Sequence, residues 1–311
     1  MSLPQMMKDV WDNHFESLTP MMKNYLETKK QHEDCIIFYR LGDFYEMFFD
    51  DALEASKVME ITLTGKSCGL EERAPMCGVP YHAVDIYINK LVTRGYKVCI
   101  VEQAEDPALA KGLVKREVSR IVTPGTNLNL TAMDEGKNNY LMSIAYIGGK
   151  FGISIADVTT GDYYVTEVYS ERNVLDEINK FMPTEIICNH AFLMCGMDID
   201  DIKNRLSISV FELEEWYFDE NNCSEVLKDH FGIMDLSGLG ISEMSLGVIA
   251  SGSLLKYLYE TQKNSLTHLS KLVPYSTSTF MILDTSTRRN LELCETLREK
   301  QKRGSLLWVL D

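Results

Sequence analysis

The stretch Ile36–Phe49, IIFYRLGDFYEMFF, decides how the first part of this 311-residue chain is read. An apolar run of strand length opens it and is broken by Gly42 and Asp43. Apolar residues then recur at helical spacing from Tyr45 to Met59, with acidic residues on the opposite side. The pattern predicts a strand, a tight turn and a helix.

Two side chains of this stretch allow two interpretations. In the predicted helix Asp43 is the N-cap, Glu46 completes an acidic capping box, and Phe44 lies at the edge of the apolar stripe. An aromatic residue at a helix start usually packs locally as a hydrophobic staple. The alternative is an exposed Phe-x-Glu pair that reads a ligand. The pattern by itself leaves both interpretations open, and local packing is the commoner outcome.

Ordered matches to one family favour the second interpretation. The segment Arg40–Phe48, RLGDFYEMF, resembles the GDFYE segment of the mismatch-binding domain of the MutS family, the bacterial DNA mismatch-recognition ATPases. Further matches follow in the order of that family: Leu18–Met22, Leu63–Thr64, Pro75–Val84, Val101–Gln103 and Arg120–Thr126. The resemblance implies that Phe44 enters the minor groove beside a mispair and kinks the duplex, and that Glu46 contacts a base.

The resemblance leaves the chemistry of Glu46 open. Near phosphates a carboxylate is repelled unless a base N–H faces it. Glu46 would therefore either accept a hydrogen bond from thymine N3–H, or become protonated and donate one to a purine N7. The preferred mispair cannot be read from the sequence.

The predicted fold class is α/β, in three parts. Residues 1–125 are expected to form a small mixed-sheet mismatch-binding domain, and residues 126–260 an RNase H-like connector domain. The connector prediction rests on three successive strands, Tyr140–Ile147, Phe151–Asp157 and Asp162–Val168, followed by alternating helices and strands. Residues 261–311 would be the truncated start of an α-helical core that includes a strand over Phe280–Leu283.

An RNase H-like fold raises the hypothesis of a metal-dependent nuclease. Such an enzyme needs several carboxylates that converge on two metal ions, and one of these carboxylates belongs to the first strand. Tyr140–Ile147 contains no acidic residue, and Asp157 and Asp162 flank a turn. We therefore expect no metal site and no catalytic residue. The sequence has no GxxxxGK[ST] phosphate loop, so ATP and Mg²⁺ are implied for the full-length family member and not for this chain.

The net charge of −15 is unevenly distributed: −4 over residues 1–125, −14 over 126–260 and +3 over 261–311. The middle part should repel DNA. Candidates for contact with the DNA backbone are Lys111, Lys115, Arg116 and Arg120. The acidic middle part also suits a protein-interaction module. The resemblance implies a MutL-like partner for the connector and a homodimer for the full-length protein.

Two further features bound the class of protein. No apolar run approaches the roughly 20 residues of a membrane span, and charged residues precede any apolar N-terminal segment, so a cytoplasmic location is expected. The eight cysteines form no CxxC motif and lie mostly in apolar runs. Buried, reduced thiols are therefore expected instead of disulfides or a zinc site.

Overall fold

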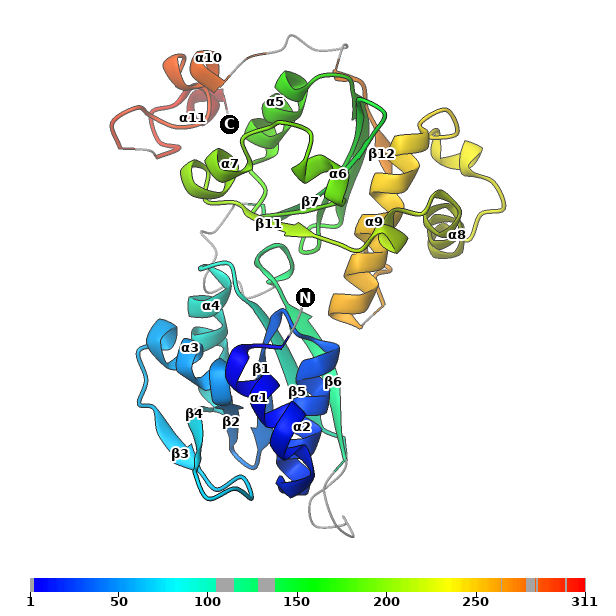
Figure 1. Ribbon diagram of the computed structural model, residues 1–311. Coiled ribbons are helices and arrows are strands. Elements are labelled where there is room, and N and C mark those ends of the chain that lie inside the picture. The colour runs from blue at the N-terminus through cyan, green and yellow to red at the C-terminus, as the bar shows by residue number, and fades with distance from the viewer. Residues whose placement is uncertain are drawn as a thin grey trace. The chain divides into compact units, whose positions relative to one another are not determined.

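The computed structural model describes residues 3–104, 115–127, 138–263, 265–277, 283, 285–299 and 301–310. The chain divides into two compact units (Figure 1). The first is Met1–Asn139 with Tyr257–Leu266, and the second is Tyr140–Lys256 with Thr267–Asp311. Each contains a six-stranded mixed sheet, which confirms the predicted α/β class. The division of the chain at residues 125 and 260, and the start of a helical core, stay predictions.

The sheet of the first unit has the order β3-β4-β2-β1-β5-β6. Strand β1 pairs parallel with β5 and antiparallel with β2, and the remaining neighbours are antiparallel. The strands are β1 Cys35–Leu41, β2 Phe44–Phe48, β3 Thr64–Lys66, β4 Ala74–Pro80, β5 Lys97–Gln103 and β6 Arg116–Val122. The central strands β1 and β2 are therefore covered on both edges.

Helices lie on both faces of this sheet (Figure 1). They are α1 Gln5–His14, α2 Pro20–Gln31, α3 Phe49–Met59 and α4 Val84–Val92. Along β1 the side chains alternate between two cores: Ile37 and Tyr39 pack with α1 and α2, whereas Ile36 and Phe38 pack with α3 and α4. Thr19 precedes α2 and Pro20 is its first residue, where the fixed φ of proline suits a helix.

The predicted strand, turn and helix at Phe44 is wrong in its last part. Phe44 begins strand β2, which pairs with β1 across the two-residue turn Gly42-Asp43, and the helix begins only at Phe49. Tyr45 and Phe48 are three residues apart, as on one face of a helix, but they enter opposite cores. Pairing with β1 and β4 overrides the helical spacing.

Strand β4 contains the whole segment from Pro75 to Pro80, although prolines are more typical of turns than of strands. The strand pairs with β3 through Pro75 and with β2 through Pro80. Both prolines stand near the ends of the strand, where a missing N–H donor disturbs the ladder least.

The sheet of the second unit has the order β11-β10-β7-β8-β9-β12. Its first three strands follow the predicted bounds closely. The strands are β7 Tyr140–Ile147, β8 Lys150–Asp157, β9 Asp162–Val168, β10 Glu185–Cys188, β11 Ser209–Glu212 and β12 Val273–Pro274. The helices are α5 Glu171–Phe181, α6 His190–Leu193, α7 Ile199–Arg205, α8 Glu220–Phe231, α9 Ser245–Gln262, α10 Thr285–Asn290 and α11 Leu306–Leu310, and the last residues of α9, from Tyr257, belong to the first unit.

Helices also cover both faces of this second sheet (Figure 1). One core contains residues of α5, α6 and α7, and the other contains residues of α8 and α9. Gly152 on β8 allows α9 to approach, because a Cβ atom there would lie 2.1 Å from the Leu246 carbonyl oxygen. Of the strand predicted over Phe280–Leu283, only Leu283 is described, and it is in no regular element. No helix in the described ranges is long and apolar enough to cross a membrane.

Candidate nucleic-acid interface

Phe44 is the exposed aromatic residue at the start of β2. Its backbone pairs with Leu41 on one side and Pro80 on the other. The side chain is 46% exposed, although the next residue, Tyr45, is buried. The ring therefore stands on a rigid, doubly paired strand and is open to solvent, so it does not act as a helix-start staple.

The hairpin turn beside Phe44 is held by its neighbours. Gly42 has a φ of +57°, a backbone conformation that favours glycine. The Tyr81 N–H donates to the Asp43 carbonyl at 2.9 Å. The Arg40 side chain donates to the Gly42 carbonyl, and its guanidinium lies 4.0 Å from the centre of the Tyr81 ring. These contacts fix the position from which Phe44 projects.

Glu46 lies two residues along β2 and therefore on the same face as Phe44. Its Oε2 atom lies 2.5 Å from Nζ of Lys66 on β3. The residue opposite Glu46 on β4 is Gly78, where an added Cβ would lie 3.5 Å from Glu46 Cγ and 3.3 Å from the Tyr45 carbonyl oxygen. Glu46 thus forms an ion pair in a strand and does not complete a capping box.

The sequence pattern does not identify Lys66 as the partner of Glu46. The three residues of β3 give too short an alternation to predict a strand. The contact depends on the order β3-β4-β2, which no local signal contains.

Tyr45 anchors the face of β2 opposite to Phe44 and Glu46. Its hydroxyl donates to Oε1 of Glu102 on β5. Burial, together with the hydrogen bond to Glu102 and the charge of Glu102, raises the pKa of Tyr45 to about 12. Tyr45 is therefore a neutral hydrogen-bond donor at physiological pH.

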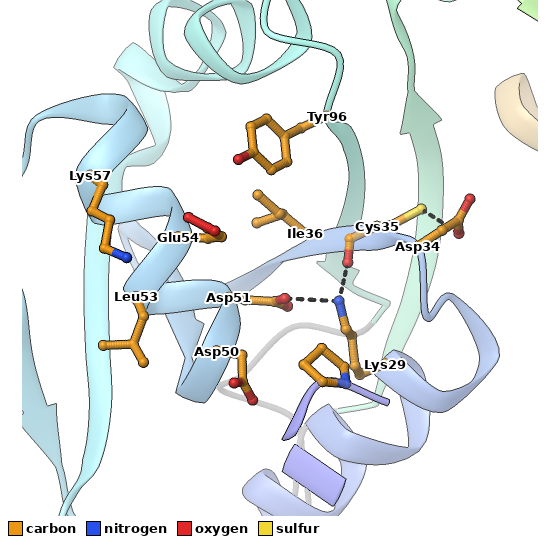
Figure 2. A pocket seen from close by; sticks show the side chains of 11 residues that line it. Lys29, Asp34, Cys35, Ile36, Asp50, Asp51, Leu53, Glu54, Lys57 and Tyr96 are labelled. Atoms are coloured by element: carbon orange, nitrogen blue, oxygen red, sulfur yellow. Dashed lines mark hydrogen bonds and ion pairs between the residues drawn. The ribbon is translucent and has the colours of Figure 1, made fainter. Parts of the chain in front are cut away.

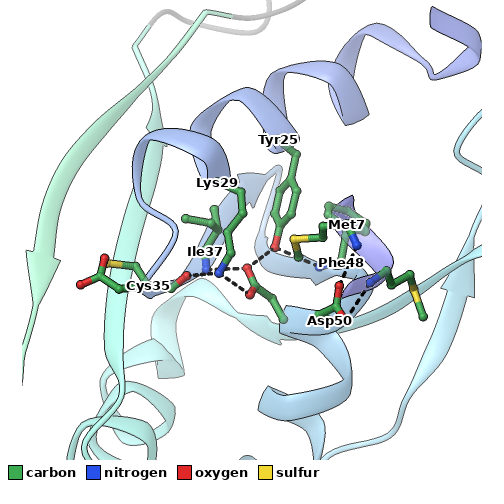
Figure 3. A network of polar contacts seen from close by, with 10 residues as sticks. Met7, Tyr25, Lys29, Cys35, Ile37, Phe48 and Asp50 are labelled. Atoms are coloured by element: carbon green, nitrogen blue, oxygen red, sulfur yellow. Dashed lines mark hydrogen bonds and ion pairs between the residues drawn. The ribbon is translucent and has the colours of Figure 1, made fainter. Parts of the chain in front are cut away.

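A buried polar network lies behind the hairpin (Figure 3). The Asp51 carboxylate accepts from Lys29 Nζ at 2.8 Å, from the Tyr25 hydroxyl at 2.8 Å and from the Ile37 N–H at 3.0 Å. Lys29 also donates to the Cys35 carbonyl at 2.6 Å. The network joins α2, β1 and α3, and its polar groups satisfy one another.

This network contacts strand β2 through Tyr25. The Phe48 N–H donates to the Tyr25 hydroxyl at 3.2 Å, and the two rings pack edge to face at 5.0 Å. Burial and the Asp51 charge keep the pKa of Tyr25 well above its ordinary value. The next residue, Phe49, has a φ of +54°, which is uncommon for an aromatic residue, at the point where strand becomes helix. The network and this bend together set where β2 ends.

A pocket of about 410 Å³ opens beside the network (Figure 2). Lys29 and Asp51 in its wall bond to each other. Asp50 accepts from the Met7 N–H at 2.8 Å and so caps α1. Asp34, in the same wall, pairs with Lys97 at 2.8 Å. These polar groups hold elements together and are occupied by protein partners.

The residues predicted to contact the DNA backbone differ in their distance from the hairpin and in their partners. Arg116 donates to the Arg40 carbonyl at 3.1 Å, and its guanidinium lies 4.9 Å from the Tyr39 ring centre, close to the hairpin. Arg120 pairs with Ile100 farther along β6. Lys115 pairs with Glu117 at 2.6 Å. Lys111 lies outside the described residues, and contact of the four with DNA stays a prediction.

The aspartates considered for nuclease chemistry have structural partners. The buried Asp157 carboxylate accepts from the Thr159 N–H at 2.8 Å and from the Thr159 hydroxyl at 2.6 Å. Asp162 accepts from the Thr160 hydroxyl at 2.9 Å. Across the part of the chain that is described, no group of three or more His, Cys, Asp or Glu side chains is arranged to hold a metal ion.

Comparison with known proteins connects this geometry to a family. Residues 19–131 match the family model of MutS domain I, and residues 139–270 match that of MutS domain II. The chain belongs to the MutS family. The hairpin with Phe44 and Glu46 therefore lies in MutS domain I, and strands β7 to β11 of the second sheet lie in MutS domain II.

Curated relatives match almost the whole chain. DNA mismatch repair protein MutS of Lachnoclostridium phytofermentans is 64% identical over 294 residues, which are 94% of this chain and 32% of the relative. The MutS proteins of Ruminiclostridium cellulolyticum and Acetivibrio thermocellus are 54% and 51% identical over 298 residues, which are 95% of this chain and 34% of each relative. The chain spans about a third of the length of the MutS proteins that it matches.

Proposed function

We propose that the first unit recognises mispaired or unpaired bases in duplex DNA, with Phe44 as a minor-groove wedge and Glu46 as its base-contacting partner. The observation that carries the proposal is a half-exposed phenylalanine on a rigid hairpin, with an ion-paired carboxylate two residues away on the same face. The relatives are named as DNA mismatch repair proteins, and the hairpin lies in MutS domain I.

The selectivity of such a wedge has a physical basis. Inserting an apolar side chain between base steps costs a few kcal/mol of unstacking. A mispaired step has already lost part of its stacking and pairing, so the same insertion costs less there. Discrimination then arises from how easily the duplex deforms. A rigidly mounted ring suits this role, because little conformational entropy is lost when it enters DNA.

Most of the affinity for the duplex must come from phosphate contacts outside residues 1–260. Residues 1–125 carry a net charge of −4 and residues 126–260 carry −14. Stable binding needs several phosphate contacts, and those that we propose for Lys111, Lys115, Arg116 and Arg120 are few. We expect this chain alone to bind a mismatched duplex weakly at physiological salt, with Kd at about tens of micromolar or higher. Titration of a labelled duplex would measure this, and nanomolar mismatch-selective binding would contradict it.

The decisive experiment uses a full-length MutS protein whose domains I and II are this sequence. Affinity is measured at fixed salt for matched and single-mismatch duplexes, with Phe44→Ala beside the unmodified protein. We expect the unmodified protein to prefer the mismatch by about tenfold or more, equivalent to about 1.4 kcal/mol. The variant should lose this preference and keep its affinity for matched DNA.

The matched control is Tyr169→Ala, which removes another exposed ring, 64% exposed, from the second unit. It should leave the preference unchanged. Equal preference in Phe44→Ala and the unmodified protein would contradict the wedge.

The roles of the longer MutS protein are proposals on family grounds. They comprise ATP and Mg²⁺ use by another domain, homodimer formation, and contact of the connector with a MutL-like partner. The charge of −14 over residues 126–260 is the feature of this chain that suits a protein partner better than DNA.

A further inference from the structure

Lys66 is the cation that faces the Glu46 carboxylate. Its ammonium bonds to Oε2 of Glu46 at 2.5 Å and lies 5.7 Å from the centre of the Phe48 ring. The Lys66 side chain is 34% exposed and that of Glu46 is 16% exposed. The pair therefore lies at the rim of the sheet, partly shielded from water and within reach of a ligand at the hairpin.

The neighbouring strands supply the other groups around Glu46. Tyr39 on β1 is directly opposite Glu46, and its hydroxyl donates to Asn24 at 2.6 Å. The Arg116 guanidinium lies over the Tyr39 ring. Gly78 on β4 contributes no side chain. Among the described contacts of the Glu46 carboxylate, the charged partner is Lys66.

The ion pair determines which hydrogen bonds Glu46 can make. The pair is formed by an ionised carboxylate, and an ionised carboxylate only accepts hydrogen bonds. Lys66 engages Oε2 and so orients the group, leaving Oε1 as the atom to meet a base. The ammonium also offsets the repulsion between this carboxylate and nearby phosphates.

We propose that Lys66 is a positioning and specificity-determining residue, which holds Glu46 as an acceptor and directs the reader to mispaired bases that offer a ring N–H. Thymine N3–H and guanine N1–H are such groups, whereas an unpaired adenine offers N7, which would require a protonated Glu46. This inference rests on the proposed function and deepens it.

The test compares Lys66→Met with Lys66→Arg in a full-length MutS protein whose domains I and II are this sequence. Methionine keeps the length of the side chain and removes its charge, and arginine keeps the charge. Affinities are measured for a G·T mispair, an unpaired adenine and a matched duplex at pH 6.5, 7.5 and 8.5 and constant salt.

The unmodified protein and Lys66→Arg should favour G·T over unpaired adenine by the same ratio at all three pH values. Lys66→Met should lower that ratio about tenfold, as expected when a hydrogen bond to a charged group is lost.

Two outcomes would overturn the inference. One is a Lys66→Met protein whose ratio stays within twofold of the unmodified protein at every pH. The other is an equal loss in Lys66→Arg, which would assign Lys66 a merely structural role. Both leave the proposed function standing if Phe44→Ala still abolishes mismatch preference. An unmodified protein without any mismatch preference would contradict the proposed function itself.

Discussion

Two regions of the first unit each hold a lysine paired with a carboxylate, and water reaches them to different extents. In the network behind the hairpin, the side chains of Lys29 and Asp51 are each 4% exposed, and both make additional hydrogen bonds to other groups. At the sheet rim, Lys66 is 34% and Glu46 16% exposed. The groups of the enclosed pair bond only to protein partners among the described contacts, whereas the rim pair is open to solvent and could bond to a ligand instead. The same kind of ion pair thus stabilises the fold in one place and, in our proposal, holds the base-contacting Glu46 in the other.

Removing the enclosed carboxylate should break the scaffold. Asp51→Ala leaves the Lys29 ammonium buried without its counter-charge and removes the acceptor of Tyr25 and of the Ile37 N–H. We expect the free energy of unfolding of the first unit to fall by about 3–5 kcal/mol. Denaturant unfolding combined with hydrogen exchange of the Ile37 amide measures this loss.

The matched control is Glu54→Ala, an exposed acidic residue on the same helix. It should change the free energy of unfolding by about 0.5 kcal/mol or less. A similarly small change in Asp51→Ala would show that the network does not stabilise the first unit.

A third ion pair of the first unit extends the comparison to pH. Asp34 pairs with Lys97, and their side chains are 38% and 8% exposed. Burial raises the pKa of Asp34, but the charge and hydrogen bond of Lys97 outweigh it and leave the pKa lowered. A lowered carboxyl pKa adds stability above the unfolded value of about 3.9, and this stability is lost as the pH falls through the folded value.

Asp34→Asn should therefore lower the free energy of unfolding at pH 7 by about 0.2–1 kcal/mol, the range for partly exposed pairs. The difference from the unmodified protein should stay constant down to about pH 5 and shrink below about pH 4. Urea unfolding at several pH values gives this difference. A difference that grows on acidification would reverse the sign and refute the assignment.

The rim pair should also contribute little to folding, far less than the enclosed pair. Glu46→Gln is expected to change the free energy of unfolding by about 0.2–1 kcal/mol at low salt, and by less in about 1 M salt, where the Debye length is about 3 Å. Parallel unfolding curves at the two salt concentrations measure the change. A loss comparable to that of Asp51→Ala would mean that Glu46 is part of the scaffold, and the contrast between the two regions would fail.

The second unit was the easier one to predict from the sequence. Its strands β7 and β9 begin and end where their patterns do, because turns at Gly148-Gly149 and Gly161 separate the strands clearly. Each strand also pairs with its neighbour in sequence, so local signals contain the register.

The hairpin of β1 and β2 is harder to predict from the sequence, for a physical reason. The apolar spacing from Tyr45 onward runs across the end of β2 and the start of α3, and so reads as one helix. The exposure of Phe44 depends on strand pairing with β1 and β4, and the partner of Glu46 comes from a strand two positions away in the sheet. The resemblance in sequence pointed to both residues, but neither their strand setting nor Lys66 could be deduced from periodicity.

The most direct measurement of the central claim asks whether Phe44 unstacks a base. An aminopurine base is placed beside a G·T mispair, and its fluorescence is followed as a full-length MutS protein with these two domains binds. The account predicts a rise in fluorescence for the unmodified protein, because an unstacked aminopurine is no longer quenched by its neighbours. It predicts no rise for Phe44→Ala at saturating protein. An equal rise in both proteins would show that the base is unstacked without Phe44 and would contradict the wedge.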